Sequence, residues 1–414
     1  MNDDVSNLDL NSFDPSDIEL FQDDRWRPYF GRLRREAPVH YCPDSVYGPF
    51  WSVTTHELIK SVDTNHVDFS SAKGVSIVDE QEMPTSSDIE VQNFINMDPP
   101  RHDDQRKSVA PATAPSNLAN LEPIIRNRVT EILDGLPRGE TFNWVDRVSI
   151  ELTASMLSVL FNFPHDDRRK LVHWSDVATS ATQFVGDDDL EEKMAVIMAE
   201  LQECGMAFYQ LWFERQAQDP QFDLISMLVH SEATQNMHED PGLFLGTILL
   251  LIVGGNDTTR NSISGGVLAL NQFPEEYEKL RANHALIPSM VSEMVRWQTP
   301  VIHMRRQAVR DVELGGQTIK EGDKVLMWYL SGNRDESVFE DADRFIIDRP
   351  NVRHHLSFGF GVHRCMGNRL AEMQLRVLWE EIMASFNNIE LVGDVERVPS
   401  NFIRGIRNVP VRVS

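Results

Sequence analysis

The chain has 414 residues, and its 39 Lys and Arg stand against 64 Asp and Glu, a formal net charge of −25 at pH 7. This charge argues against a nucleic-acid binder, which needs a basic surface for phosphates, and against docking on anionic lipid. Hydrophobic residues at 41% and charged residues at 25% are typical of an ordinary globular protein. A chain of this length can bury about three quarters of its unfolded surface, enough to enclose a large ligand.

The cysteines and the N-terminus bear on the cellular compartment. Cys42, Cys204 and Cys365 are too few and too scattered for a disulfide framework. The first 24 residues hold eight acids and no Lys or Arg, unlike an export signal or a mitochondrial presequence. The longest uncharged apolar run, 242–255, has 14 residues, fewer than the ~18 expected for a membrane span. We therefore expect a cytoplasmic protein without a membrane span.

In chain order, residues 1–20 are expected to form an acidic, flexible N-terminus, and 21–414 a single domain without repeats or linkers. Stretches 48–54 and 310–329 read as short strands, the second with glycine-bearing turns. Apolar residues recur at spacings of three and four in the longer segments. These predict helices over 118–134, 146–162, 190–217, 242–273, 286–297 and 367–386. The fold class is therefore mainly α with a small β portion.

The stretch 357–370, SFGFGVHRCMGNRL, surrounds Cys365 with glycines and is followed by a helical pattern. A thiolate that ligates a metal needs backbone N–H groups directed at its sulfur, and a glycine-bearing turn before a helix N-terminus supplies them. The alternative is a small hydrophobic cysteine in a loop, which the glycine pattern disfavours. A dinucleotide-binding loop is excluded, because Arg364 stands at the third glycine position and no βαβ unit surrounds it.

With the spacing Phe358-x-x-Gly361-x-x-x-Cys365-x-Gly367, this segment resembles the cysteine-ligand loop of the cytochrome P450 superfamily, the haem-thiolate monooxygenases. The resemblance extends over nearly the whole chain. It implies the cytochrome P450 fold, a triangular α-rich prism that encloses haem b (iron protoporphyrin IX). It also implies that Cys365 is the axial ligand of the haem iron, with Phe358 and Gly367 beside the cofactor.

The motif GGNDTT at 254–259 interrupts the apolar pattern of the helix 242–273. A threonine hydroxyl that bonds back to a preceding carbonyl, beside two glycines, can open the helix locally and leave room for O₂ and water. By resemblance, Thr258 stabilises the iron-bound hydroperoxide and Asp257 delivers protons. The alternative is a helix kink with a capping pair. Arg260 departs from better-known relatives, has no evident chemical role and is expected to be a structural partner.

Two further sets of residues take their roles from the resemblance. Glu293 and Arg296 share a helix face at i, i+3, and with Arg349 they would form a buried structural cluster. The haem propionates need cationic partners, which Arg and His supply well. The expected partners are His102, Arg106, Arg306 and His363, with Arg305 as a competitor for the role of Arg306.

Four segments resemble the bacterial soluble family that hydroxylates medium-chain n-alkanes at the terminal methyl: GGNDTTRNS, SEMVRWQTP, INMDPPRHDDQRK and FGFGVHRCMGNRLAEMQLRVLWEEI. The implied pocket carries no charge, and each candidate could equally be an ordinary core residue. The candidates are Val75, Ile77, Val78, Leu250, Val253, Gly254, Val301, Ile302, Phe402 and Ile403. The methionine- and aromatic-rich stretch 194–214 is either a mobile lid or, residue by residue, amphipathic packing.

The electrons are expected to come from other proteins, since the sequence has no flavin, nicotinamide or iron–sulfur motif. The resemblance implies a ferredoxin and its reductase, with NAD(P)H as the ultimate source. Residues 349–370 contain four arginines, three histidines and no acid. Arg353, Arg364 and Arg369 are therefore the candidate dock for an acidic ferredoxin, whereas Arg349 is expected to be internal. We expect a monomer.

Two alternatives to alkane hydroxylation stay open. The same chemistry could act on fatty acids, terpenoids or cyclic hydrocarbons. From another class, the chain could be a haem-binding sensor or carrier without turnover. The Asp257–Thr258 pair argues against a sensor, because a sensor has no need of proton delivery.

Overall fold

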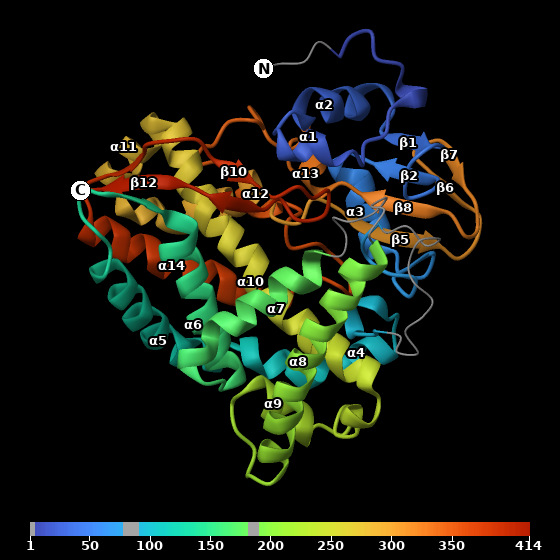
Figure 1. Ribbon diagram of the computed structural model, residues 1–414. Coiled ribbons are helices and arrows are strands. Elements are labelled where there is room, and N and C mark those ends of the chain that lie inside the picture. Colours follow the sequence, from blue (N-terminus) through green and yellow to red (C-terminus); the bar gives the residue numbers. More distant parts are fainter. Residues whose placement is uncertain (1–4, 78–90, 181–189) are drawn as a thin grey trace.

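A long helix, α10 (Pro241–Gln272), runs through the middle of the molecule, and the other elements are arranged around it (Figure 1). The computed structural model describes residues 5–77, 91–180 and 190–414. The helix begins at a cap, because the Asp240 carboxylate accepts hydrogen bonds from the amides of Gly242 and Leu243. By length and composition alone α10 could cross a membrane. However, 61% of its most apolar window is buried in protein, as in the core helix of a globular fold.

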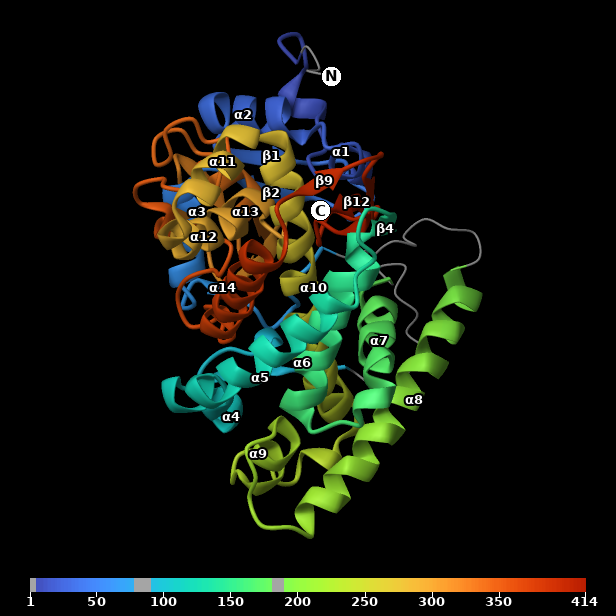
Figure 2. The same ribbon diagram turned by 90° about the vertical axis from the view of Figure 1, so that its left-hand side faces the viewer.

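Helices α4 to α9 lie together on one side of the molecule, and α11, α12 and α14 lie beside α10 (Figure 2). A π-helical turn, Val145–Ile150, leads directly into α6. The other helices are α1 (Ile18–Gln22), α2 (Trp26–Glu36), α3 (His56–Thr64), α4 (Arg101–Val109), α5 (Pro115–Asp134), α6 (Glu151–Phe161), α7 (Arg168–Ser180), α8 (Leu190–Gln216), α9 (Leu224–His230), α11 (Pro274–Ala282), α12 (Ile287–Gln298), α13 (Tyr329–Gly332) and α14 (Asn368–Ser385).

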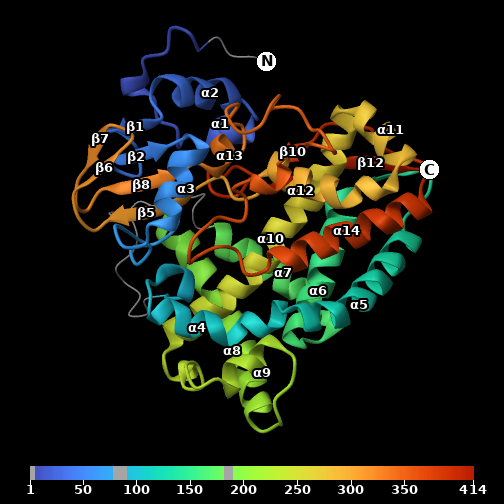
Figure 3. The same cartoon turned by 180° about the vertical axis from the view of Figure 1, so that it is seen from behind.

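In the described residues the strands form four small sheets, the largest of five strands at the end of the molecule near α3 (Figure 3). In its order β1-β2-β8-β5-β3, only β2 and β8 are parallel. Strand β12 joins β4 and β9 in a second sheet, while β6–β7 and β10–β11 form two-stranded sheets. The strands are β1 (Val39–Cys42), β2 (Phe50–Val53), β3 (Phe69–Ser70), β4 (Thr141–Asn143), β5 (Met304–Ala308), β6 (Val312–Leu314), β7 (Gln317–Ile319), β8 (Lys324–Met327), β9 (Ile389–Leu391), β10 (Glu396–Arg397), β11 (Ile406–Asn408) and β12 (Pro410–Val413).

The predicted elements are present. Five of the six predicted helices are found with their ends within three residues of the expected ones, and the sixth, 146–162, corresponds to the π-helical turn Val145–Ile150 together with α6. Stretch 48–54 contains β2, and 310–329 contains β6, β7 and β8. The mainly α class with a small β portion is confirmed.

The acidic N-terminal segment, expected to be flexible over 1–20, packs against the rest of the chain. Residues 1–4 lie outside the described residues. From there on, Phe13 is buried and stacks on Tyr29, and the amide of Asn401 donates to the carbonyl of Ser16. The expected boundary at residue 20 therefore coincides with no break in the packing.

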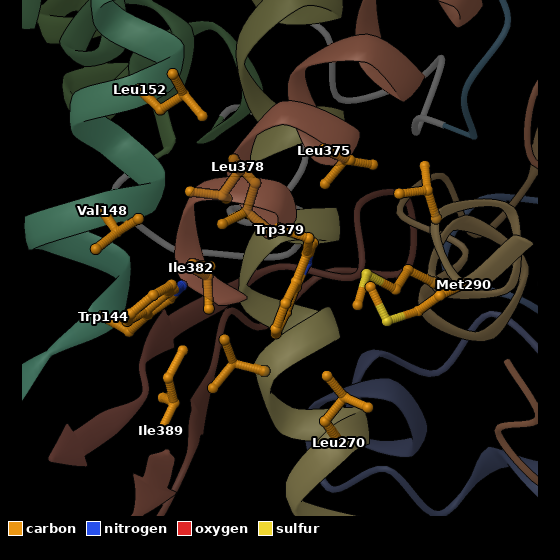
Figure 4. Close-up of a cluster of buried hydrophobic side chains, with 14 of the residues drawn as sticks. Trp144, Val148, Leu152, Leu270, Met290, Leu375, Leu378, Trp379, Ile382 and Ile389 are labelled. Carbon is orange, nitrogen blue, oxygen red and sulfur yellow. The ribbon is translucent and has the colours of Figure 1, made fainter. Parts of the chain in front are cut away.

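The largest hydrophobic cluster joins helices that are far apart in the sequence (Figure 4). Trp144 and Val148 before α6, Leu270 of α10, Met290 of α12 and Trp379 of α14 are each at most 1% exposed. Their packing fixes α14, and with it the loop that precedes α14, against the central helix.

A buried ion cluster of Glu293, Arg296 and Arg349 fixes α12 to the loop that contains Arg349, as the family resemblance implies. The Arg296 guanidinium donates to both Glu293 oxygens, at 2.7 and 2.8 Å, and Arg349 donates to the same carboxylate at 3.1 Å. Arg296 also donates to the carbonyls of Asn333 and Ala342. The carboxylate and the Arg296 side chain are fully buried.

We expect Glu293→Ala to lower the free energy of unfolding by about 3–5 kcal/mol, because it leaves two buried guanidinium groups without their counter-charge. The measurement is denaturant unfolding followed by circular dichroism. The control is Glu278→Ala, which breaks an i, i+3 pair with Arg281 whose carboxylate is 71% exposed. That variant should change the free energy by less than about 1 kcal/mol. Equal losses in the two variants would contradict the buried-cluster assignment.

Candidate functional site

The loop before α14 places Cys365 three residues before the N-terminal residue of that helix, Asn368. The Cys365 amide donates to the carbonyl of Phe358 at 2.8 Å, and the amides of Gly367 and Asn368 donate to its sulfur. Gly361 has a φ of +64°, and a Cβ there would lie 2.4 Å from the carbonyl oxygen of Asp63. Only glycine therefore fits this turn. The amides directed at the sulfur are those that the glycine pattern led us to expect.

Burial raises the pKa of the Cys365 thiol, and the amides of Gly367 and Asn368 and the charges of Arg106 and Arg364 act against that effect. The side chain lies deep in the protein, and its exposed surface faces a cavity that it lines. It is therefore accessible to a ligand in that cavity, with hydrogen-bond donors and positive charge placed to stabilise a thiolate.

The cavity measures about 500 Å³ and lies between the Cys365 loop and α10. Its walls are mostly aliphatic and aromatic, and no Asp or Glu is found among its described lining residues. The cations on its wall are Arg106 and Arg306, with His363 nearby in the same lining. The cavity therefore suits a large ligand that is apolar in most parts and anionic at one edge.

Thr258 of α10 lines the cavity, and its hydroxyl donates to the carbonyl of Gly254 at 3.0 Å. A Cβ at Gly254 would meet no atom within 4 Å, so glycine leaves space beside this hydroxyl. The back-bond is the one expected from the sequence. The expected local opening is not seen, since α10 is helical from Pro241 to Gln272.

Asp257 points away from the cavity and is 1% exposed. Its carboxylate accepts from Arg260 at 2.6 Å, and the same guanidinium contacts Asp176 of α7 at 2.8 Å. Burial raises the pKa of Asp257 to about 6. The positive charge of Arg260 lowers this pKa in part, and the negative charge of Asp176 raises it further. Arg260 is thus the structural partner expected from the sequence, and it joins α10 to α7.

The four candidate propionate partners gather at one edge of the cavity. Arg106, Arg306 and His363 line it, and the His102 ring lies 4.4 Å from that of His363. The Nε2 atom of His102 is buried and has no hydrogen-bond partner. In β5, Arg306 faces the cavity whereas Arg305 does not line it. This supports Arg306 over Arg305.

These residues fit haem b. Cys365 lies at the cavity wall as a possible iron ligand, and the walls between it and Thr258 are apolar. Two arginines and an orphaned buried histidine nitrogen lie where carboxylates would find donors. Phe358 and Gly367 also line the cavity beside Cys365.

Asp63 of α3 is a residue of this site that sequence reasoning missed. Its carboxylate accepts from Arg306 at 2.9 Å, from the Tyr329 hydroxyl at 2.9 Å and from the Phe360 amide at 2.6 Å. A signal was present, because Asp63 lies four residues after Ile59 on the buried face of α3. A carboxylate on an apolar helix face needs buried partners.

The substrate candidates divide into two groups. Those that line the cavity are Val75, Leu250, Val253, Gly254, Val301, Phe402 and Ile403. The prediction is wrong for Ile77 and Ile302, which are 1% and 0% exposed and pack with Trp328 in a separate hydrophobic cluster. Val78 lies outside the described residues. Cavity residues that the sequence did not single out include Phe94, Leu157, Leu160, Leu249 and Met304.

Helix α8 contains the whole stretch 194–214, whose side chains divide between a buried and an exposed face. Phe208 and Trp212 are fully buried, whereas Met206 and Phe213 are 65% and 52% exposed. None of these residues lines the cavity. The structure therefore favours amphipathic packing over a lid.

The arginines around the Cys365 loop differ in exposure. Arg353, Arg364 and Arg369 are exposed, whereas Arg349 is buried in the Glu293 cluster. The Arg364 guanidinium lies over the Phe360 ring, 5.9 Å from its centroid. Three exposed cations therefore remain on this surface for a partner.

Comparisons with known proteins identify the family of this chain. The family model "Cytochrome P450" matches residues 46–406. Linalool 8-monooxygenase of Pseudomonas putida is 40% identical over 396 residues, covering 92% of this chain and 94% of that protein. Methyl-branched lipid omega-hydroxylase of Mycobacterium tuberculosis is 31% identical over 418 residues, covering 98% and 95%.

Solved structures are similar over nearly the whole chain. Cytochrome P450-153 from Novosphingobium aromaticivorans is 45% identical with a TM-score of 0.90, covering 97% of this chain and 99% of that one. The Mycobacterium marinum cytochrome P450 in complex with pseudoionone is 33% identical with a TM-score of 0.88, covering 98% and 100%. The chain belongs to the cytochrome P450 family of haem-thiolate monooxygenases.

Proposed function

We propose that this cytochrome P450 hydroxylates medium-chain n-alkanes or similar apolar chains at the terminal methyl group, using O₂ and electrons from a ferredoxin. The observation that carries the proposal is the apolar cavity between Cys365 and Thr258, which holds charge at one edge only. Haem b bound through Cys365 supplies the O₂ activation that inserts one oxygen atom into a C–H bond. NAD(P)H, through a ferredoxin reductase, is the ultimate electron source.

Residues of the chain bind the substrate and hold protons. The aliphatic walls, among them Leu250, Val253 and Phe402, exclude water from the chain that they enclose. Thr258 presents its hydroxyl to the cavity, and Asp257, one residue before it, can hold a proton near neutral pH because its pKa is about 6. A carboxyl that holds a proton near neutral pH, one residue before a cavity hydroxyl on the same helix, suits turnover rather than sensing.

The cavity favours neutral chains over fatty acids. A carboxylate inside an apolar wall needs a cation, and Arg106 and Arg306 are the only Arg or Lys among the described lining residues. Both lie at the edge assigned to the haem propionates. For a neutral chain each buried methylene adds about 0.8 kcal/mol, so affinity should rise gradually with length.

A second candidate substrate is an acyclic terpenoid. Two observations favour it: the 40% identity to linalool 8-monooxygenase and the 33% identity to a structure that holds pseudoionone. The resemblance of four segments to alkane hydroxylases and the 45% identity to the cytochrome P450-153 structure favour alkanes. Both candidates are apolar chains, and the cavity has room for either.

The exposed arginines support an electron-transfer partner. Arg353, Arg364 and Arg369 form a basic surface next to the Cys365 loop, on a chain whose net charge is −25. An acidic ferredoxin would be repelled elsewhere and attracted here. We place the protein in the cytoplasm as a monomer.

The first prediction concerns Asp257 and pH. Its carboxyl has a pKa of about 6 in the folded protein against 3.8 as a model value, so the folded state binds the extra proton between these pH values. The stabilisation by that proton is lost as the pH rises through this window. From pH 4 to pH 7, Asp257→Asn should therefore gain up to about 3 kcal/mol in unfolding free energy relative to the parent. Denaturant unfolding at several pH values measures this.

The control for that experiment is Asp146→Asn, whose carboxylate is 47% exposed. Its unfolding free energy should stay within about 1 kcal/mol of the parent's, because the substitution breaks only an exposed ion pair with Arg169. If Asp257→Asn also runs parallel to the parent, then Asp257 does not hold a proton in this range.

The second prediction tests the substrate. The reduced protein with CO should absorb near ~450 nm, as a thiolate-ligated haem does, and Cys365→Ser should lose that band.

Octane-like alkanes should produce a low- to high-spin shift with an affinity that rises with chain length, whereas fatty acids of equal length should bind more weakly. Tight binding of linalool without a response to alkanes would favour the terpenoid instead.

A matched pair of variants locates the chain in the cavity. Val253→Phe fills space on the α10 wall, so the best-bound alkane should become shorter. Val196→Phe makes the same change on the exposed face of α8, where Val196 is 60% exposed, and should leave the length profile unchanged. Identical profiles in both variants would show that the substrate does not lie along α10.

The third prediction tests the ferredoxin surface. Arg364→Ala and Arg369→Ala together should raise the KM for an acidic ferredoxin several-fold and weaken its dependence on salt, because two exposed cations are lost. The control is Lys170→Ala on α7, whose ammonium is 52% exposed. Unchanged KM and salt dependence in the double variant would exclude this surface as the dock.

A further inference from the structure

Three chain segments far apart in the sequence contribute to the cavity wall together with α10. They are 75–76 after β3, 300–304 before and into β5, and 402–403 in the C-terminal region. Main-chain hydrogen bonds hold the middle segment to the other two. The Arg305 amide donates to the carbonyl of Val75 at 2.7 Å, and the Ile302 amide donates to that of Phe402 at 2.8 Å.

A single side chain, His303, also bonds to both outer segments. It is 0% exposed, lies behind the wall and does not line the cavity itself. Its Nδ1 lies 2.9 Å from the carbonyl oxygen of Asn401, and its Nε2 lies 3.3 Å from the amide of Ile77. Its ring packs against the Phe402 ring, with centroids 5.5 Å apart, and Phe402 is a cavity residue.

The two bonds require one tautomer of a neutral imidazole. A carbonyl oxygen only accepts, so Nδ1 carries the proton and donates to Asn401. A backbone amide only donates, so Nε2 accepts from Ile77. Burial lowers the pKa of His303 to about 4, and the ring therefore keeps this donor–acceptor arrangement at neutral pH. A charged ring would lose the acceptor.

We propose that His303 is a positioning residue that sets the shape of the substrate cavity. It does so by holding the segment at Ile77 and the segment at Asn401–Phe402 to the chain just before β5. This inference rests on the proposed use of the cavity for substrate. A shift of the ring moves Phe402 and the Val75–Ile77 segment together, so the width and end of the cavity depend on this side chain in addition to the main-chain bonds. His303 thereby determines which chain lengths fit and which carbon lies over Cys365.

Three variants of the haem-loaded enzyme separate the two bonds. His303→Phe keeps a ring of similar size and removes both bonds. In His303→Asn the side-chain NH₂ lies close to the place of Nδ1 and can still donate to Asn401. In His303→Gln the side-chain carbonyl reaches the place of Nε2 and can still accept from Ile77. The control is His56→Phe, which removes the bond between a buried His56 ring and the carbonyl of His354.

Two series of ligands report the cavity. The first consists of n-alkanes of rising length, read by the spin-state shift and by the ratio of terminal to subterminal alcohol. The second consists of 1-alkylimidazoles of rising chain length, whose free ring nitrogen binds the haem iron and whose alkyl chain probes the cavity whatever the natural substrate is. Thermal unfolding of each variant is recorded alongside.

For His303→Phe we expect at least a fivefold weaker binding of the best-fitting chain in both series, a flatter length profile and a several-fold lower terminal ratio. His303→Asn and His303→Gln should fall between this variant and the parent. His56→Phe should keep both profiles within twofold, even where it unfolds at a lower temperature. If the His303 variants lose thermal stability but keep the parent's profiles, His303 is only structural and the inference is wrong.

The alkylimidazoles separate this inference from the proposed function. If the parent enzyme does not respond to alkanes, the proposed substrate fails. A changed alkylimidazole profile in the His303 variants would still support the role of His303 in that case. An unchanged profile would overturn it, whatever the alkanes do.

Discussion

One buried carboxylate, Asp63, holds together the parts of the structure that form the reactive end of the cavity. It accepts hydrogen bonds from Arg306 in β5, from Tyr329 in α13 and from the amide of Phe360 in the Cys365 loop. Its own main-chain carbonyl lies against Gly361 in that loop. The ion pair with Arg306 compensates part of the cost of burying both charges. Asp63 thereby orients a cavity cation and the cysteine loop from one helix position.

The parts of the site that could be predicted from the sequence are those whose chemistry is local in the chain. The glycines, Cys365 and the following helix lie within one short segment, so the turn and the amides at the sulfur could be inferred from their order. The bond from Thr258 to Gly254 spans four residues, and the pair of Glu293 with Arg296 spans three. The longest helices could be predicted for the same reason, since their apolar spacing repeats over several turns.

The parts that could not be predicted depend on contacts between distant segments. Asp63 and Arg306 are 243 positions apart, and His303 and Ile77 are 226 positions apart. In extended chain, neighbouring side chains point to opposite sides, so an apolar run does not show which residues face the cavity. Val301 therefore lines the cavity while Ile302 is buried in another cluster, and in β5 Arg306 lines it while Arg305 does not.

The two walls of the cavity are held by different kinds of interaction, and the difference follows from where charge can be tolerated. On the α10 side, the ion triad of Asp257, Arg260 and Asp176 lies behind the helix and reaches water through Asp176, which is 52% exposed. Such charges can be screened and protonated there. On the opposite side, His303 is fully buried behind apolar residues without contact with water. His303 bonds only to a main-chain carbonyl and a main-chain amide, so a charge on its ring would be buried without a counter-charge at a cost of several kcal/mol. A neutral imidazole can therefore connect these wall segments, whereas Arg306 needs the carboxylate of Asp63.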